Sequence, residues 1–253
     1  MVIPARNAKP SLGSPFLTAE WRYLAMLNYE IDPAILTPFV PKGTELDSWN
    51  GKTFVSVVGF LFLNTRVMGL AIPFHRNFEE INLRFYVRRK AEDGWRRGVV
   101  FIKEIVPRTA IALTARWLYN ENYVALPTGN EILRSPDGFA HIESAKYYWT
   151  FRNRAQFIEL VPQGEPVLIA EGSEEEFIAQ HYWGYSVQKN GGTVEYRVEH
   201  PTWRIWKQRS CRLECDMEEF YGKPFAQALG AAPSSAFLAE GSEVTVYRGK
   251  RIE

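Results

Sequence analysis

Alternation of apolar and polar residues is the strongest pattern along the chain, and it predicts a protein built mainly from β-strands. The clearest case is the segment Phe78–Val87, in which every second residue from Ile81 onward is apolar. Its two sets of residues are Ile81, Leu83, Phe85 and Val87 on one side, and Glu80, Asn82, Arg84 and Tyr86 on the other. Successive side chains of a strand point to opposite faces, so this strand is expected to bury one face and to place a polar face elsewhere.

Three turn sequences lie between strand-like segments and predict hairpins. They are Asn50-Gly51, Glu92-Asp93-Gly94 and the segment Lys189–Gly192. Asn-Gly and Asp-Gly adopt the positive φ angles that tight hairpin turns require. The segments that they join are 46–49 with 53–63, 78–89 with 95–106, and 183–188 with 193–200. Further strands, outside these hairpins, are expected over 21–31, 138–151, 155–160, 204–215 and 244–247.

The predicted helices are few and short. Asp32 precedes Pro33, which is typical of an N-cap followed by proline in the first helical turn. The segment Ser173–Glu176 has the pattern of a capping box. The helices expected from these and similar signals cover 33–39, 108–120, the residues after 173, 217–221 and 224–229.

Many strands with few helices favour one fold class, which is mainly β (α+β). We expect a curved antiparallel sheet that closes into a barrel, with a few peripheral helices. No linker rich in proline, glycine and serine divides the chain. Residues 1–253 are therefore expected to form a single domain, and 1–14 are expected to be an irregular N-terminal arm.

Composition narrows the class of protein further. The chain has 253 residues, 46% of them hydrophobic, with 30 Lys and Arg against 29 Asp and Glu. A net charge of +1 argues against a nucleic-acid partner, which requires excess positive charge, and against binding to anionic membranes by charge alone. No apolar stretch approaches the roughly 20 residues of a spanning helix, and no signal peptide is visible. We expect a cytoplasmic protein without a membrane partner, for which a homo-oligomer remains open.

The common catalytic and cofactor signatures are absent from the sequence. The two cysteines, Cys211 and Cys215, are interpreted as buried thiols in a reducing compartment, and without nearby histidines they make a poor zinc site. The four histidines show no metal-ligand spacing, and each is by default a structural residue. No metal or cofactor is therefore predicted.

The segment 99–106 carries two adjacent charges, Lys103 and Glu104, among apolar residues on both faces. One charge is therefore expected inside the protein, where an unpaired charge is very costly. A hairpin turning at Asp93 brings Asn82 opposite Glu104, with Arg84 as its diagonal neighbour. This arrangement predicts either a structural Arg84–Glu104 ion pair or a cluster that binds a polar ligand.

Lys103 has two interpretations of its own. A desolvated lysine has a lowered pKa and can act as a Schiff-base nucleophile. Alternatively, its stem lies along an apolar surface while its ammonium reaches water.

The polar face of the strand 78–87 also has two interpretations. It is either the solvated outside of the sheet or the lining of a pocket, because small barrels often enclose one ligand. In the second case Glu80, Asn82, Arg84 and Tyr86 are candidate ligand-binding residues. His75 and Arg76 join them as candidates because they directly precede this strand, at the expected rim.

Several segments together resemble the YqjF-like family of bacterial proteins, which is placed with the acetoacetate decarboxylase-like superfamily. The resemblance extends from about Leu17 to Val246. The segments that carry it are Asn28-Tyr29-Glu30 with Pro33, 44–51, Gly59-Phe60, Pro73–Arg76, 78–87, 98–107, Tyr119–Tyr123, His181–Tyr185 and Gly241-Ser242. It implies a largely antiparallel sheet that closes into a cone-shaped barrel around a pocket.

The resemblance also raises the question of activity. Acetoacetate decarboxylase works through a Schiff-base lysine whose pKa is lowered by a second, adjacent lysine. This sequence contains no two adjacent lysines and offers Lys103-Glu104 near the comparable strand, where the carboxylate would raise the pKa of the lysine.

Two hypotheses follow. The first is a lyase, such as a decarboxylase, that acts on an oxo acid with Lys103 as nucleophile, Arg84 as carboxylate anchor and Glu80 or Glu104 as acid/base. The second is a non-catalytic protein that binds a small anionic or carbonyl-containing ligand. The direction in which the Lys103 amine points distinguishes them.

Overall fold

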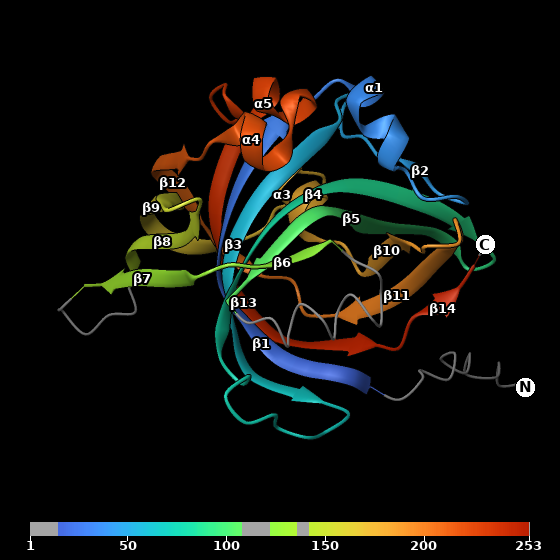
Figure 1. Cartoon of the computed structure of the whole chain (residues 1–253), viewed down its shortest axis with the longest axis horizontal. Helices are drawn as coiled ribbons and strands as arrows, with labels where there is room; N and C mark the ends of the chain where they lie inside the picture. Colours follow the sequence, from blue (N-terminus) through green and yellow to red (C-terminus); the bar gives the residue numbers. More distant parts are fainter. Residues whose placement is uncertain (1–14, 108–121, 136–141, 253) are drawn as a thin grey trace, which may run out of the picture.

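The computed structural model describes residues 15–107, 122–135 and 142–252, and its framework is one large curved sheet (Figure 1). Seven strands of this sheet close into a ring through consecutive pairings, the last of which joins β11 to β13. In order around the ring they are β1 (Pro15–Glu30), β3 (Phe54–Val67), β4 (Phe78–Ala91), β5 (Gly94–Val106), β10 (Trp183–Val187), β11 (Thr193–Glu199) and β13 (Ser235–Tyr247). The prediction of a mainly β protein with a curved, closing sheet is confirmed.

The remaining strands extend the ring or pair with its edges. From β13 the sheet continues through β12 (Arg204–Glu214), β9 (Arg154–Leu168), β8 (Ile142–Phe151) and β7 (Thr128–Arg134). The short strands are β2 (Glu45–Leu46) on β4, β6 (Tyr123–Ala125) on β5 and β14 (Lys250–Arg251) on β11. The sequence did not predict β6 and β7, which are short and half-exposed.

Short helices cover parts of this sheet, and their caps follow the sequence signals. They are α1 (Pro33–Leu36) with the following 3-10 turn Thr37–Phe39, α3 (Glu174–Ala179), α4 (Met217–Tyr221) and α5 (Lys223–Leu229). Asp32 accepts a hydrogen bond from Ala34 N at 2.8 Å, and Ser173 accepts one from Glu176 N at 3.1 Å. Both side chains satisfy free N–H groups at a helix start, as predicted. The helix expected over 108–120 lies outside the described residues, as do residues 1–14.

Two of the three predicted hairpins form with the expected strands. The turn at Asp93-Gly94 joins β4 to β5, and the segment Lys189–Gly192 joins β10 to β11. The third prediction is only partly right. Asn50 and Gly51 form a tight turn with φ angles of 49° and 78°, but β2 pairs with β4 instead of β3. The turn therefore sits on a single bridge between Trp49 and Lys52.

A β-bulge in β5 changes which of its side chains share a face. Asn82 pairs with Glu104 and Leu83 with Lys103, but Arg84 pairs with Phe101, so Ile102 is the extra residue. Continuous alternation had placed Lys103 on the same face as Val99 and Phe101. The bulge instead puts Glu104 on that face, and the sequence-based assignment of faces in this strand is corrected accordingly.

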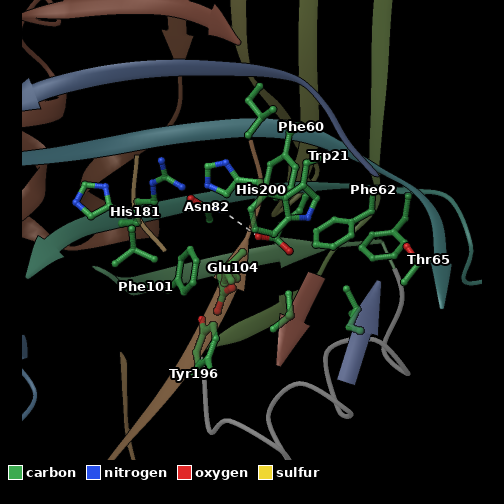
Figure 2. A pocket seen from close by; sticks show the side chains of 18 of the residues that line it. Trp21, Phe60, Phe62, Thr65, Asn82, Phe101, Glu104, His181, Tyr196 and His200 are labelled. Carbon is green, nitrogen blue, oxygen red and sulfur yellow. Dashed lines mark hydrogen bonds between the residues drawn. The ribbon is translucent and has the colours of Figure 1, made fainter. Parts of the chain in front are cut away.

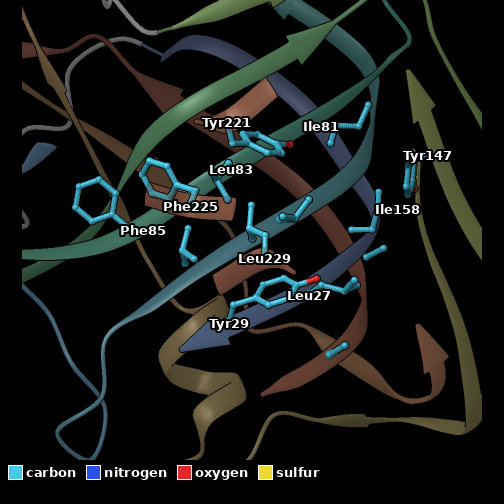
Figure 3. Close-up of a cluster of buried hydrophobic side chains, with 14 of the residues drawn as sticks. Leu27, Tyr29, Ile81, Leu83, Phe85, Tyr147, Ile158, Tyr221, Phe225 and Leu229 are labelled. Carbon is cyan, nitrogen blue, oxygen red and sulfur yellow. The ribbon is translucent and has the colours of Figure 1, made fainter. Parts of the chain in front are cut away.

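The two faces of the ring bury different sets of side chains. On the outer face, α4, α5, β8 and β9 cover β1, β3 and β4, as Figure 3 shows for one cluster of buried residues. Gly59 on β3 permits this packing because a Cβ there would lie 2.7 Å from the Tyr147 ring. The inner face carries a second cluster, which includes residues of β1, β3, α3 and β13. Across the described residues, no helix has the length and apolar character needed to span a bilayer.

Candidate functional site

A cavity of about 340 Å³ lies inside the ring of strands (Figure 2). Its volume falls in the range of about 300–1,000 Å³ that is usual for small-molecule sites. Most of its wall is aromatic or aliphatic, and polar side chains gather toward one end. The aromatic wall comes from Trp21, Phe60, Phe62, Phe78, Phe101 and Trp203. The polar end comprises Glu80, Asn82, Arg84, Glu104 and His181, whereas Thr65, His75 and His200 line other parts of the cavity.

The polar face of β4 supplies the centre of this polar end. Glu80, Asn82 and Arg84 line the cavity, whereas Ile81 and Leu83 point into the outer cluster. Strand alternation alone accounts for this division, and the sequence identified both sets. The interpretation of the polar set as a pocket lining is therefore favoured over that of a solvated outer surface.

Glu80 is buried with 3% of its surface exposed. Asn82 Nδ2 donates a hydrogen bond to Glu80 Oε1 at 3.0 Å, and the Tyr123 hydroxyl donates to Oε2 at 3.4 Å. Burial raises the pKa of Glu80 to about 7, and these hydrogen bonds and the charge of Arg84 offset only part of that effect. Near neutral pH this carboxyl group can therefore both donate and accept a proton.

Arg84 and Asn82 keep unused hydrogen-bonding capacity. Arg84 Nη2 donates to the carbonyl oxygen of Ile178 at 3.3 Å, and Arg84 Nε has no partner within the described part of the chain. Asn82 Oδ1 is likewise buried without a described partner. Buried polar atoms normally have partners, so these two atoms indicate a place where a ligand or water binds.

Arg84 and Glu104, which are both described, do not form the predicted ion pair. The bulge at Ile102 places Phe101 opposite Arg84, so the two charges lie one residue further apart than the simple register implied. Glu104 itself is 1% exposed, pairs with Asn82 as predicted and lines the cavity.

His181 follows α3 and reaches the same polar end of the cavity. It stacks on the Tyr86 ring with centroids 4.7 Å apart and is 7% exposed. Burial, together with the positive charges of Arg97 and Arg84, holds the pKa of His181 well below its ordinary value, so the ring is neutral. Within the described residues neither ring nitrogen has a hydrogen-bond partner of good geometry, although the Ile178 carbonyl oxygen, which accepts from Arg84, lies close enough to the ring to oppose the lowering of its pKa.

His200 and His75 line other parts of the cavity wall. His200 stacks on Trp203 with centroids 4.2 Å apart, and burial lowers its pKa. His75 is half-buried, and its Nδ1 lies 2.8 Å from the carbonyl oxygen of Pro73. We had interpreted His181 and His200 as structural residues. Nothing in their spacing along the chain indicates that they lie in the same cavity as the polar face of β4.

Two candidate residues on or beside β4 are not among those that line the cavity. Tyr86 lies on the cavity face of β4 but is covered by His181 and bonds to Ser56 at 2.6 Å. Arg76 is exposed, and its Nη2 donates to Asn64 at 3.2 Å. Each therefore supports neighbouring structure instead of the cavity wall.

Lys103 points to the opposite face of β5 from Glu104. Its ammonium donates a hydrogen bond to the carbonyl oxygen of Phe220 in α4 and lies 4.2 Å from the centre of the Phe220 ring. Burial lowers the pKa of Lys103, contrary to the rise expected from an adjacent carboxylate. The amine is therefore not placed to attack a ligand in this cavity.

No described group of three or more His, Cys, Asp or Glu side chains is arranged to hold a metal ion. Cys211 and Cys215 are both free thiols, and Cys215 Sγ donates to Gln156 Oε1 at 3.0 Å. The candidate site is thus an aromatic cavity with an acid, an amide, a guanidinium and a neutral imidazole at one end.

Known proteins resemble this chain in sequence and in fold. The model of the DUF2071 family, described as an uncharacterized conserved protein, matches residues 18–243. The uncharacterized protein YqjF of Bacillus subtilis is 25% identical over 182 residues, which is 72% of each chain.

Two solved structures show the same overall fold at low sequence identity. The acetoacetate decarboxylase of Legionella pneumophila superposes with a TM-score of 0.66 at 12% identity, over 99% of this chain and 92% of that one. The enduracididine biosynthesis enzyme MppR, complexed with pyruvate, gives 0.66 at 12% identity over 99% and 95%. The resemblance expected from the sequence is confirmed: the chain has an acetoacetate decarboxylase-like fold and belongs to the DUF2071 family.

Proposed function

We propose that this protein binds a small organic molecule with a carbonyl or carboxylate head, and that the head lies at the polar end of the cavity. The observation that carries the proposal is the set of buried polar atoms without described partners, Asn82 Oδ1, Arg84 Nε and the two ring nitrogens of His181. All three side chains line one cavity with an apolar wall. A ligand that completes their hydrogen bonds recovers part of the cost of burying them.

The chemistry of these groups favours an oxygen-rich head. Arg84 supplies a fixed positive charge, and its free Nε can donate to a carbonyl or carboxylate oxygen. Protonated Glu80 can donate to a second oxygen. The neutral His181 ring offers one donor and one acceptor. The fold gives independent support for an oxo acid, because MppR has been solved in complex with pyruvate.

Isothermal titration with a panel of 2- and 3-oxo acids of increasing apolar size tests this proposal. We expect measurable binding that strengthens with the apolar part, and a loss of at least about tenfold on Arg84→Lys, because lysine cannot reproduce the guanidinium geometry. Arg76→Lys is the matched control, since Arg76 is exposed and does not line the cavity. Equal effects of the two substitutions, or no binding by any member of the panel, would refute the proposal.

The pH dependence of binding gives a second test of the same site. Above pH 7 the Glu80 carboxyl group is mainly ionised and repels an anionic head, so affinity for a carboxylate should fall as the pH rises through about 7. Glu80→Gln should remove this step. A pH profile that is unchanged in the variant would show that Glu80 does not face the bound head.

A second candidate function is a lyase that uses Glu80 as its acid. The pKa of about 7 favours it, because a carboxyl group tuned to neutral pH is suited to proton transfer. In decarboxylation of a 3-oxo acid, the bond between C1 and C2 breaks, carbon dioxide leaves, and the electron pair forms an enol. Glu80 would give its proton to the ketone oxygen; when the enol returns to the ketone, C2 takes a proton from water and the enol O–H returns its proton to Glu80.

Proton NMR of 3-oxo acids in D₂O distinguishes binding from catalysis. A lyase converts the substrate to the ketone faster than buffer does, and Glu80→Gln abolishes the acceleration. Borohydride should trap no adduct in either case, because Lys103 lies outside the cavity. Binding without any acceleration would leave the non-catalytic function as the correct one.

A further inference from the structure

The aromatic end of the cavity also contains buried polar atoms that lack partners. Trp21 Nε1 and Thr65 Oγ1 are both buried, both residues line the cavity, and neither atom has a hydrogen-bond partner among the described residues. Trp203, in the same wall, shows the usual arrangement, because its Nε1 donates to Ser242 Oγ at 2.8 Å. A buried indole N–H normally finds an acceptor. Trp149 and Trp206 Nε1 in the outer cluster also lack a described one, and Trp21 differs from them because it lines the cavity, where a ligand can supply it.

The Trp21 ring is held firmly by its neighbours. It makes edge-to-face contacts with Phe60 and Phe62, at centroid distances of 5.5 and 5.8 Å, and with Trp203 at 6.4 Å. These rings surround it on several sides. The His200 imidazole also lies beside this ring, with centroids 6.5 Å apart, yet no described group accepts from the indole N–H, which can only donate.

The strand register gives the separation between this donor and the polar end. Trp21 pairs with Phe62, and Phe62 pairs with Phe78, two residues along β4 from Glu80. At the usual rise of a strand, two residues correspond to about 7 Å. Phe62 and Phe78 stack with centroids 4.7 Å apart in this interval. Figure 2 shows Trp21, Phe62 and Thr65 on one side of the cavity and Asn82, Glu104 and His181 on the other.

We infer that the ligand carries a second oxygen at its far end, and that Trp21 Nε1 and Thr65 Oγ1 bind it. The inference rests on the proposed function, since it concerns the same ligand. The ligand class that fits is an aromatic oxo acid whose ring lies among Phe60, Phe62 and Phe78 and bears a hydroxyl or ether oxygen opposite the acid head. This makes Trp21 the residue that selects the oxygenated ring.

The charge of the lining residues determines the kind of far-end oxygen. Arg84 is the single arginine or lysine among the described residues that line the cavity, and it belongs to the polar end. Among the described lining residues, a second carboxylate at the aromatic end would therefore find no fixed positive partner. A neutral hydroxyl or ether oxygen requires none.

Titration with phenylpyruvate and 4-hydroxyphenylpyruvate tests this inference, because the two probes differ by one oxygen. We expect the wild-type protein to bind the hydroxylated probe about tenfold more tightly, as one buried hydrogen bond contributes. Trp21→Phe should remove this preference while leaving phenylpyruvate affinity within about threefold, since the ring is retained. Thr65→Val should reduce the preference in the same direction.

Trp95→Phe is the matched control, because Trp95 is 51% exposed and lies outside the cavity wall. If both probes bind equally to the wild type, or if Trp21→Phe keeps the preference, the second subsite is refuted while the proposed function stands. If neither probe binds but smaller oxo acids do, only this inference fails. If no oxo acid binds, the proposed function fails and this inference with it. The wild-type comparison remains decisive should Trp21→Phe not fold.

Discussion

The two faces of β4 are both buried, yet they differ in whether their buried side chains find the contacts or hydrogen-bond partners that they need. On the outer face, Ile81, Leu83 and Phe85 are completely covered by apolar neighbours. On the cavity face, Asn82 is 1% exposed, but its Oδ1 has no described partner. On β4, burial alone therefore does not separate the core face from the cavity face; the unmatched Asn82 Oδ1 and Arg84 Nε on the cavity face do.

The largest expected effect concerns the outer face. Leu83→Ala removes a fully buried side chain from the outer cluster, and we expect the free energy of unfolding to fall by about 2–5 kcal/mol. Urea denaturation measures this change. Oxo-acid affinity of the remaining folded protein should stay at the wild-type value. A variant that loses binding without losing stability would mean that the two faces are not independent.

The next effect is a pH dependence of stability that originates on the cavity face. The pKa of Glu80 rises from its ordinary value of 4.5 to about 7 on folding, so the folded protein holds this proton more tightly. Its contribution to stability is complete below pH 4.5 and is lost as the pH rises through 7. At 1.36 kcal/mol per pKa unit, the loss amounts to about 3 kcal/mol.

Urea denaturation of Glu80→Gln between pH 4.5 and 8 measures this contribution. In that range the free energy of unfolding of the wild type should fall as the pH rises, and that of the variant should not. Glu45→Gln is a suitable control, because Glu45 forms an exposed ion pair with Arg88. The assigned environment of Glu80 would be wrong if its substitution and that of Glu45 gave the same pH profile.

A smaller effect of opposite sign is expected at His181. Phenylalanine has a similar shape and removes two buried nitrogens without described partners, so His181→Phe should stabilise the protein by about 1–2 kcal/mol. The same change should weaken oxo-acid binding. Thermal denaturation and titration together check the prediction, which fails if stability and affinity both fall.

The smallest effect is expected at Lys103. Its ammonium is half-buried against α4, where it contacts the Phe220 ring and carbonyl oxygen. Lys103→Met retains the apolar stem, so the free energy of unfolding should change by less than about 1 kcal/mol. Ligand affinity and the rate of any oxo-acid turnover should remain unchanged. Loss of ligand binding or turnover in this variant would show that Lys103 takes part in the site.

Local signals were sufficient to predict the architecture and the polar strand. The turn between Ala91 and Gly94 sets the register as far as Arg84 opposite Phe101, and the bulge at Ile102 then shifts it by one residue, so that Asn82 lies opposite Glu104 as expected. Five of the eight candidate site residues line the cavity, namely His75, Glu80, Asn82, Arg84 and Glu104. They come from one hairpin and its rim, where contacts are short-range along the chain.

The features that could not be predicted depend on single-residue irregularities or on contacts between distant segments. No turn residue marks the bulge at Ile102, which reverses the faces of Lys103 and Glu104 relative to continuous alternation. His181 and Trp21 reach the cavity only because the ring closes between β11 and β13. Closure of a sheet leaves no local pattern in the sequence.

The bulge at Ile102 decides which functional group β5 presents to the cavity. An amine and a carboxylate stand next to each other in β5, and the extra residue before them determines which of the two enters the ligand space. In a strand of regular alternation beyond Phe101, the amine would occupy the place that the carboxylate holds here. The presence or absence of this one bulge, with every residue of the strand retained, is therefore enough to exchange a carboxylate for an amine at the cavity wall.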